Sequence, residues 1–321
     1  MAMTKASKIW MNGKWVPWDD ARIHILSHVV HYASSVFEGI RCYDTRRGPA
    51  IFRLGRHLDR FMLSAKIYRM ELPFTREQIE KACIEVVAVN DLRECYIRPL
   101  IYRGYENLGV NPFGNPIDVA IAAFPWGKYL GEDALNKGVA AKVSSWNRMA
   151  PNTMPAMAKA SSNYMNSQLM KMEALVDGYA EAIALDVSGF VSEGSGQNLF
   201  AVIDGVLVTP TLASSILAGI TRDSVMTLAR ELGYTVREEV MPREQLYAAE
   251  ELFYCGTAVE ITPITSVDRI AVGDGTRGRV TKALQDVFFG IVRGETPDRH
   301  DWMTLVPQAA GASATSATRR P

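Results

Sequence analysis

The chain has 321 residues, a length that allows about two domains. Hydrophobic residues make up 48% of it and charged residues 22%, which is the composition of a globular protein with a sizeable core. Lys and Arg number 35, and so do Asp and Glu, so the formal net charge is zero. Because such a chain attracts neither nucleic acid nor an acidic membrane surface, we expect neither as a partner.

The four cysteines are widely spaced and contain no C-x-x-C pair, which favours free thiols in a reducing compartment over a disulfide framework. The first residues lack the apolar run of a secretory signal, and no stretch approaches the roughly 20 apolar residues of a membrane span. His28 and His31 have no ligand-rich partner segment, so we expect no metal site. These features together predict a cytoplasmic protein.

The first part of the chain is predicted to be α+β with antiparallel strands. Asn12-Gly13 lies between two short apolar runs and predicts a hairpin with a type I′ turn. A helix fits residues 56–70, and Thr75 with Gln78 forms a capping box that begins a second helix. Strands are expected at 96–103 and 117–124.

Apolar periodicity lapses after Pro125, and we place the domain boundary there. The expected division is a small N-terminal α+β domain at 1–126, a linker at 127–137 and a large C-terminal domain at 138–307. Residues 308–321 have no bulky apolar side chain, so we expect a disordered tail.

The C-terminal domain is predicted to be α/β. A strand at 139–145 precedes a helix at 157–176, and Thr221 would cap a further helix that ends before Gly233. The other strands of this domain are expected at 181–187, 190–191, 199–203, 206–208 and 251–254.

Lys159 is the only charged residue between Met149 and Met170. Apolar surroundings lower the pKa of an amine, and a neutral amine is the nucleophile that Schiff-base chemistry needs. The alternative is a lysine that extends from a helix into water. Glu193, between a strand and a Gly/Ser-rich turn, is either a carboxylate held in a pocket for a cationic nitrogen or an exposed turn residue.

Two segments could bind an anion. Gly219-Ile220-Thr221 leads into a predicted helix, where backbone N–H groups and the Thr221 hydroxyl can face a phosphate. Gly256-Thr257-Ala258 follows a predicted strand and could supply a second set of N–H donors. Neither segment matches a Walker A loop or a dinucleotide-binding fingerprint, and no G-x-S-x-G motif indicates a hydrolase.

Together these segments resemble the fold-type IV enzymes that use pyridoxal 5′-phosphate, and most closely the bacterial branched-chain amino acid aminotransferases. The resemblance extends from the first hairpin to about Thr296 and implies the two-domain, D-amino acid aminotransferase-like fold. It depends on separated motifs in the order His31-Tyr32 with Phe37-Glu38-Gly39-Ile40-Arg41, Tyr96-Ile97-Arg98-Pro99-Leu100, Leu108-Gly109-Val110, Lys159 with Tyr164, Glu193-Gly194-Ser195-Gly196-Gln197-Asn198, Gly219-Ile220-Thr221 and Gly256-Thr257-Ala258.

The resemblance implies pyridoxal 5′-phosphate as the cofactor and gives roles to the residues around it. Lys159 would form the Schiff base and move the proton between the substrate Cα and the cofactor. Glu193 would pair with the pyridine nitrogen, and Tyr164 would donate to the phenolic oxygen. The other residues that would bind the cofactor, most of them at its phosphate, are Arg60, Gly219, Ile220, Thr221, Gly256 and Thr257.

The resemblance also implies a pocket for a Leu, Ile or Val side chain. Tyr96 and the backbone of Thr257 and Ala258 would bind the α-carboxylate, and Arg98 the distal carboxylate of glutamate, since a planar guanidinium matches a carboxylate. The loop of Val110 would reach a partner subunit, which implies a homodimer or a higher oligomer such as a hexamer. The pocket residues would be Tyr32, Phe37, Gly39, Tyr96, Arg98, Leu108, Val110, Trp126, Tyr129, Thr257 and Ala258.

The expected reaction is the reversible ping-pong transfer of an amino group from Leu, Ile or Val to 2-oxoglutarate, which gives branched 2-oxo acids and L-glutamate. The alternatives of the same fold are a D-amino acid transaminase, an (R)-amine transaminase and an aminodeoxychorismate lyase. A non-catalytic metabolite-binding protein is disfavoured because Lys159, Tyr164 and Glu193 are all present.

Overall fold

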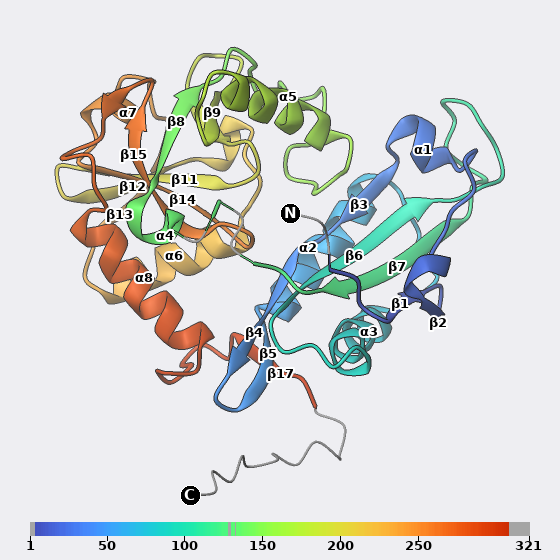
Figure 1. Ribbon diagram of the computed structural model, residues 1–321. Coiled ribbons are helices and arrows are strands. Elements are labelled where there is room, and N and C mark those ends of the chain that lie inside the picture. The colour runs from blue at the N-terminus through green and yellow to red at the C-terminus, as the bar shows by residue number, and fades with distance from the viewer. Residues whose placement is uncertain (1–3, 128–129, 132, 308–321) are drawn as a thin grey trace, which may run out of the picture.

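The computed structural model describes residues 4–127, 130–131 and 133–307. The expected tail at 308–321 and the predicted pocket residue Tyr129 lie outside these ranges. The described chain forms two lobes, each built around one β-sheet (Figure 1). No helix in the described ranges is long and apolar enough to cross a bilayer.

The first lobe contains an antiparallel sheet of the order β17-β5-β4-β6-β7-β1-β2, in which β3 also pairs with β6. Its strands are β1 (Lys8–Met11), β2 (Lys14–Pro17), β3 (Ser35–Phe37), β4 (Ile40–Thr45), β5 (Gly48–Phe52), β6 (Cys95–Arg103), β7 (Ile117–Phe124) and β17 (Met303–Leu305). Its helices are α1 (His28–Tyr32), α2 (Leu54–Ile67) and α3 (Arg76–Val89). The strand β17 comes from the far end of the described chain, so the last residues return to the first lobe.

The second lobe contains a mixed sheet of the order β10-β9-β8-β15-β14-β11-β12-β13, in which β16 also pairs with β15. Its strands are β8 (Val139–Val143), β9 (Glu181–Leu185), β10 (Val191–Gly194), β11 (Asn198–Ile203), β12 (Val206–Pro210), β13 (Val236–Glu239), β14 (Glu251–Gly256), β15 (Glu260–Val267) and β16 (Ile270–Ala271). Its helices are α4 (Ala134–Lys137), α5 (Asn163–Val176), α6 (Ile220–Glu231), α7 (Gln245–Ala248) and α8 (Arg279–Val292). The predicted combination of α+β and α/β lobes is confirmed, and the linker at 127–137 stays a proposal.

The alternation of side chains between the two faces of the first sheet determines which residues point toward the second lobe. Ile40, Cys42 and Ile97 pack on one face against α2 and α3. The residues between them point the other way, because successive strand residues alternate between the two faces. Arg41 is paired with Tyr96 across β4 and β6, so both belong to the face that is turned toward the second lobe.

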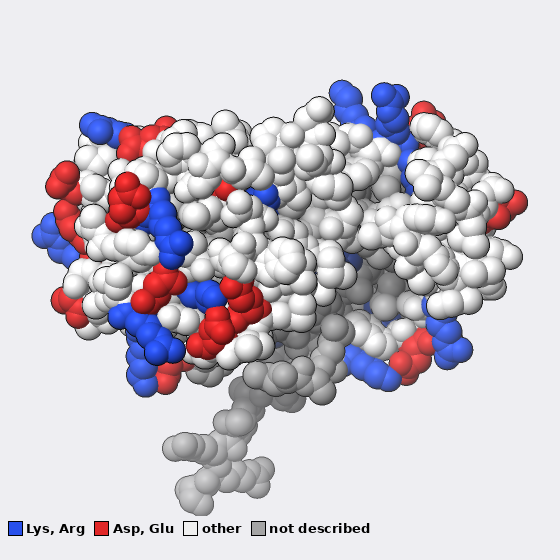
Figure 2. Space-filling view, turned by 90° about the horizontal axis from the view of Figure 1, so that it is seen from above, with Lys and Arg blue, Asp and Glu red and all other residues white. Residues whose placement is uncertain are grey.

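The apolar core continues across the two lobes. Tyr43 and Phe52 of the first sheet pack in one cluster with Phe253 of the second sheet and Phe288 of α8. A shared core of this kind holds two lobes in a fixed relation, because separating them would expose its apolar surface to water. On the face shown in Figure 2, charged side chains of both signs are mixed over the left part and at the top and right edges, and the centre is mostly uncharged.

Two of the local predictions were wrong. Residues 157–162 are not helical, because α5 begins only at Asn163; the backbone at Lys159 and Ala160 bonds instead to the first lobe. Thr221 does not cap α6, since the N-cap is Gly219 and Thr221 lies buried in the first turn. At residues 157–162, contacts with a segment distant in sequence outweigh the local helix signal, whereas α6 forms as expected and only begins earlier than Thr221.

Candidate active site

A cavity of about 280 Å³ lies between the two lobes and collects most of the predicted site residues. Lys159 and Glu193 both line it, although they come from different segments of the second lobe. The predicted residues in its wall are Phe37, Gly39, Arg60, Tyr96, Arg98, Trp126, Lys159, Tyr164, Glu193, Gly219, Ile220, Thr221, Gly256, Thr257 and Ala258.

Three predicted pocket residues lie elsewhere. Tyr32, Leu108 and Val110 do not line the cavity, and their exposed fractions are 43%, 53% and 89%. They lie on α1 and on the loop between β6 and β7, which are joined by a hydrogen bond between His28 Nε2 and the Gly109 carbonyl (3.0 Å). Their role as pocket residues stays a prediction, and it requires a second copy of the chain that brings them to a cavity.

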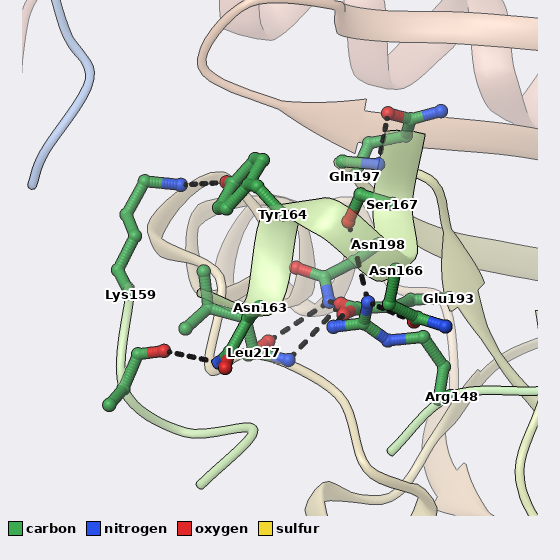
Figure 3. Close-up of polar contacts among 12 residues, drawn as sticks. Arg148, Lys159, Asn163, Tyr164, Asn166, Ser167, Glu193, Gln197, Asn198 and Leu217 are labelled. Atoms are coloured by element: carbon green, nitrogen blue, oxygen red, sulfur yellow. Dashed lines mark hydrogen bonds and ion pairs between the residues drawn. The ribbon is translucent and has the colours of Figure 1, made fainter. Parts of the chain in front are cut away.

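Both the backbone and the side-chain amine of Lys159 have defined hydrogen-bond partners. Its N–H donates to Ser64 Oγ (3.0 Å), and its carbonyl accepts from the Phe37 N–H (3.0 Å), so the first lobe fixes the segment. Its Nζ donates to the Tyr164 hydroxyl (2.7 Å) and lies 5.1 Å from the centre of the Phe37 ring. Figure 3 shows this side chain reaching toward Tyr164. The amine is thus fixed inside the cavity rather than extended into water.

Glu193 is a buried carboxylate with three donors. One oxygen accepts from Arg148 Nη2 (2.8 Å), and the other accepts from Asn198 Nδ2 and the Leu217 N–H (3.1 Å each). These groups converge on Glu193 in Figure 3. Burial raises the pKa of Glu193 above its ordinary value, and Arg148 with the Leu217 N–H opposes that rise. The turn-residue alternative is excluded, since only 5% of Glu193 is exposed.

Arg148 was missed by the sequence reasoning. It is 5% exposed and anchored to α5, where its Nη1 donates to Asn166 Oδ1 (3.1 Å) and to Ser167 Oγ (3.4 Å). A signal was present: between Lys142 and Lys171, only Arg148 and Lys159 are charged. The isolation that singled out Lys159 applies to Arg148 as well.

Arg60 is positioned by a buried carboxylate that the sequence reasoning also left without a role. Its Nε and Nη2 donate to the two oxygens of Glu38 (2.7 and 2.9 Å), and its Nη1 donates to the Ala218 carbonyl (2.9 Å). His57 Nδ1 lies 2.7 Å from Glu38. Burial alone would raise the pKa of Glu38, but Arg60 and His57 lower it well below its ordinary value. This bidentate pair fixes the guanidinium plane of Arg60 at the cavity.

The first turn of α6 forms a second part of the anion-binding wall. Its N-cap is Gly219, and no described side chain caps the helix. A Cβ at Gly219 would lie 1.8 Å from Asn198 Oδ1, so only glycine allows this close approach. The free N–H groups of a helix N-terminus attract an anion, and Ile220 and Thr221 both line the cavity.

The opposite wall combines aromatic rings with an arginine. Gly39 makes room for Tyr96, because a Cβ there would lie 1.9 Å from the Tyr96 hydroxyl oxygen. The Arg98 guanidinium lies 4.7 Å from the Phe37 ring centre, and its buried Nε has no hydrogen-bond partner among the described residues. Trp126 packs beside Tyr96 with ring centres 4.9 Å apart. This wall can therefore accept an apolar side chain and still offer a cation to a carboxylate.

Comparison with known proteins agrees with this geometry. Residues 35–267 match the family described as Amino-transferase class IV, and the chain belongs to that family. The chain is 54% identical over 309 residues to the branched-chain-amino-acid aminotransferase of Escherichia coli (strain K12), which covers 96% of this chain and 100% of that protein.

Solved structures are also similar. The Escherichia coli branched-chain amino acid aminotransferase superposes with a TM-score of 0.93 at 54% identity, covering 94% of this chain and all of that one. The branched-chain amino acid aminotransferase from Thermobaculum terrenum, in its pyridoxal 5′-phosphate form, superposes with a TM-score of 0.89 at 37% identity, covering 94% and 99%. The particular family is thus that of the branched-chain amino acid aminotransferases, and the chain is a transferase. The resemblance found in the sequence is confirmed.

Proposed function

We propose that the protein transfers amino groups between Leu, Ile or Val and 2-oxoglutarate in a ping-pong reaction, with pyridoxal 5′-phosphate as its cofactor. The observation that carries this proposal is the convergence of Lys159, Tyr164 and Glu193 on one cavity between the lobes. We also propose a cytoplasmic location, which the buried and free state of all four cysteines supports.

The donors in the cavity fit pyridoxal 5′-phosphate. Arg60, the first turn of α6 and Thr257 would hold its phosphate, Tyr164 its phenolic oxygen, and Glu193 its pyridine nitrogen. The similar enzyme from Thermobaculum terrenum was solved as a holo form with this same cofactor, which supports the assignment. When bound, the cofactor supplies an electron sink for the reacting carbon and stores the amino group between the two half-reactions.

Lys159 is the proposed base and acid of the reaction. Its Nζ would hold the cofactor at the cavity and, when free, would take and return the proton at the substrate Cα. Tyr164 orients this amine through their 2.7 Å hydrogen bond. A base must lie within hydrogen-bond reach of the proton it takes, and the backbone bonds of Lys159 to both Ser64 and Phe37 fix its segment at the cavity where the substrate would bind.

Glu193 has the task of keeping a proton on the pyridine nitrogen. Arg148 favours the ionised form of Glu193 against the effect of burial, so the carboxylate can accept a charge-assisted hydrogen bond. Such a bond contributes about 1.5–3 kcal/mol.

The two substrates share one pocket. Tyr96 and the Thr257 and Ala258 backbone would bind the α-carboxylate that every substrate carries. Phe37 and Trp126 would pack against a branched side chain, and the guanidinium of Arg98, which also lines the cavity, would bind the second carboxylate of glutamate or 2-oxoglutarate. A single site can serve both because the two substrates occupy it in turn.

We propose a homodimer or a larger assembly built from dimers. We define the flap surface as the exposed apolar residues Ile25, Val30, Tyr32, Leu108 and Val110. A second copy of the chain would cover this apolar surface, and the flap of one copy would close the cavity of the other. The segments that carry these residues adjoin, since His28 bonds to the Gly109 carbonyl and His31 to the Ile25 carbonyl, and an exposed apolar surface is typical of a protein–protein contact.

The function is tested by an amino-donor panel with 2-oxoglutarate as acceptor. The panel contains L-leucine, L-isoleucine, L-valine, their D-forms and (R)-1-phenylethylamine. We expect transfer from the branched L-amino acids, and no transfer after Lys159→Ala. Preferred use of the D-amino acids or of the amine would favour one of the other activities of this fold.

The dimer is tested by subunit complementation. Lys159→Ala and Val110→Asp chains are each expected to be nearly inactive. In a symmetric dimer, equal mixing with subunit exchange places wild-type Lys159 and wild-type Val110 together at about a quarter of the sites. Recovery of activity on mixing supports the shared site. Absence of recovery, with heterodimers demonstrated by mass spectrometry, contradicts it.

A further inference from the structure

The turn that carries Thr257 and Ala258 ends at a residue with an unusual backbone. Glu260 has a φ of +55°, in the left-handed region that side chains other than glycine and asparagine seldom adopt. It is 5% exposed and is the first residue of β15. A carboxylate held there at a conformational cost must be held by its surroundings.

The partners of Glu260 come from the first lobe. Tyr43 donates its hydroxyl to Glu260 Oε1 (3.0 Å), and Arg41 Nη1 lies 3.7 Å from the same oxygen. Arg41 and Tyr43 are both on β4 and both buried. The contact therefore joins β4 of one lobe to the turn at the cavity in the other.

Both walls of the proposed α-carboxylate site are connected through this contact. On the first lobe, Arg41 is the direct cross-strand neighbour of Tyr96. On the second lobe, Glu260 follows Ala258 by two residues, and Gly256 pairs with Glu260 where β14 meets β15. A shift of Glu260 away from β4 would thus separate the Thr257–Ala258 N–H groups from the Tyr96 hydroxyl.

We propose that Glu260 is a positioning residue that, through Tyr43 and Arg41, fixes the spacing between the Thr257–Ala258 turn and Tyr96 and so sets the affinity for the substrate α-carboxylate. The proposal rests on the proposed function for what this site binds. It concerns both half-reactions equally, since amino acid and 2-oxo acid carry the same carboxylate. It is independent of Arg98, which recognises the second carboxylate only.

Four variants test the role. Tyr43→Phe removes the hydrogen bond, and Glu260→Gln keeps the acceptor oxygen but not the charge. Glu260→Gly removes the side chain but tolerates the positive φ. It therefore distinguishes the effect of losing the carboxylate from the effect of changing the backbone conformation. The matched control is Tyr247→Phe, which removes another phenol-to-carboxylate bond, to Asp268, from residues outside the cavity wall.

The readouts are KM for leucine and for 2-oxoglutarate, kcat, and the affinity of the holoenzyme for 4-methylvaleric acid, which has the shape of leucine but no amino group. This last affinity is measured by titrating the cofactor absorbance. Cofactor affinity and thermal unfolding are recorded in parallel. For Tyr43→Phe and Glu260→Gly we expect about a tenfold loss of 4-methylvaleric acid affinity and a similar rise in both KM values. Glu260→Gln should lose less, and Tyr247→Phe nothing.

Two results would overturn the proposal. One is wild-type affinity for 4-methylvaleric acid in Glu260→Gly. That result would show that carboxylate binding needs the backbone conformation at position 260 but not the Glu260 side chain. The other is a loss of 4-methylvaleric acid affinity that is matched by an equal loss of cofactor affinity or of thermal stability. That result would mean that Glu260 has a purely structural role. Failure of the wild-type holoenzyme to transaminate at all would instead refute the proposed function, so the two failures are distinguishable.

Discussion

The ion pair of Arg148 with Glu193 offers the most informative substitution. Both side chains are about 5% exposed, and Arg148 Nη2 donates to Glu193 over 2.8 Å. Arg148→Met keeps much of the volume and removes the charge. Glu193 would then retain Asn198 and the Leu217 N–H as its donors, but no cation paired directly with it.

The magnitude follows from the burial of the pair. Removing one partner of a buried ion pair costs about 3–5 kcal/mol when the remaining charge stays ionised. Glu193 can avoid part of that cost by binding a proton, because burial already raises its pKa and Arg148 is the main group opposing the rise. A neutral Glu193 loses a charge-assisted bond of about 1.5–3 kcal/mol to the cofactor, which corresponds to roughly a 10- to 100-fold fall in kcat.

The assay is kcat for leucine and 2-oxoglutarate between about pH 6 and pH 9. The ionised form of Glu193 is the active one, and the substitution raises its pKa, so the activity of Arg148→Met should recover as the pH rises. Arg148→Lys keeps a positive charge and should lose less. In a double-mutant cycle, Arg148→Met should cost little in a Glu193→Gln background. A wild-type kcat and pH profile in Arg148→Met would refute this reasoning.

Three further predictions address other parts of the structure. Glu38→Gln should weaken cofactor binding about tenfold in absorbance titrations of the apoprotein, since Arg60 loses its bidentate carboxylate; unchanged affinity would show that Arg60 needs no such partner. Arg98→Ala should lower kcat/KM for 2-oxoglutarate about a hundredfold more than for leucine, because only the former carries a second carboxylate; equal losses would make Arg98 structural. Glu173 is partly buried, which raises its pKa, but Lys142 and nearby Ser N–H and O–H donors lower it from 4.5 to about 2. A lowered carboxyl pKa stabilises the fold above about pH 4.5, and that stability is lost as the pH falls toward about 2. Glu173→Gln should therefore reduce urea stability near neutral pH, and its difference from the wild type should shrink as the pH falls through about 2, whereas a constant difference would exclude a charge effect.

The elements that could be predicted from the sequence have local causes. Asn12 and Gly13 both take positive φ values in the first hairpin, as a type I′ turn requires. Thr75 and Gln78 form the expected reciprocal capping box at the start of α3. In each case the residues that determine the structure lie within three positions of one another, so tertiary contacts were not needed to predict it.

The parts that escaped prediction depend on contacts between distant residues. The Lys159 segment looked helical because its small residues favour a helix, yet its backbone bonds to Ser64 and Phe37 of the other lobe. Glu38 was recognised only as part of a motif, because its role depends on Arg60 being 22 residues away. Arg148 reaches Glu193 across 45 residues. None of these pairings has a periodic signature.

The predicted roles of the flap residues depend on the assembled protein rather than on contacts within one chain. Val110 is 89% exposed in the single chain, so its place in a substrate pocket stays a prediction that only the assembled protein can test. The sequence carried that information through resemblance to a family rather than through any local pattern. The single chain adds that α1 and the Val110 loop are already joined, through His28 and Gly109.

The central claim is that the Lys159 amine holds the cofactor. Borohydride reduction of the holoenzyme fixes such a linkage irreversibly, and proteolysis with mass spectrometry then locates it. We predict that the peptide containing Lys159 gains the mass of the reduced cofactor and that Lys159→Ala gains none. Attachment to another lysine, such as Lys142 or Lys171, or no attachment in a protein that transaminates, would contradict the account.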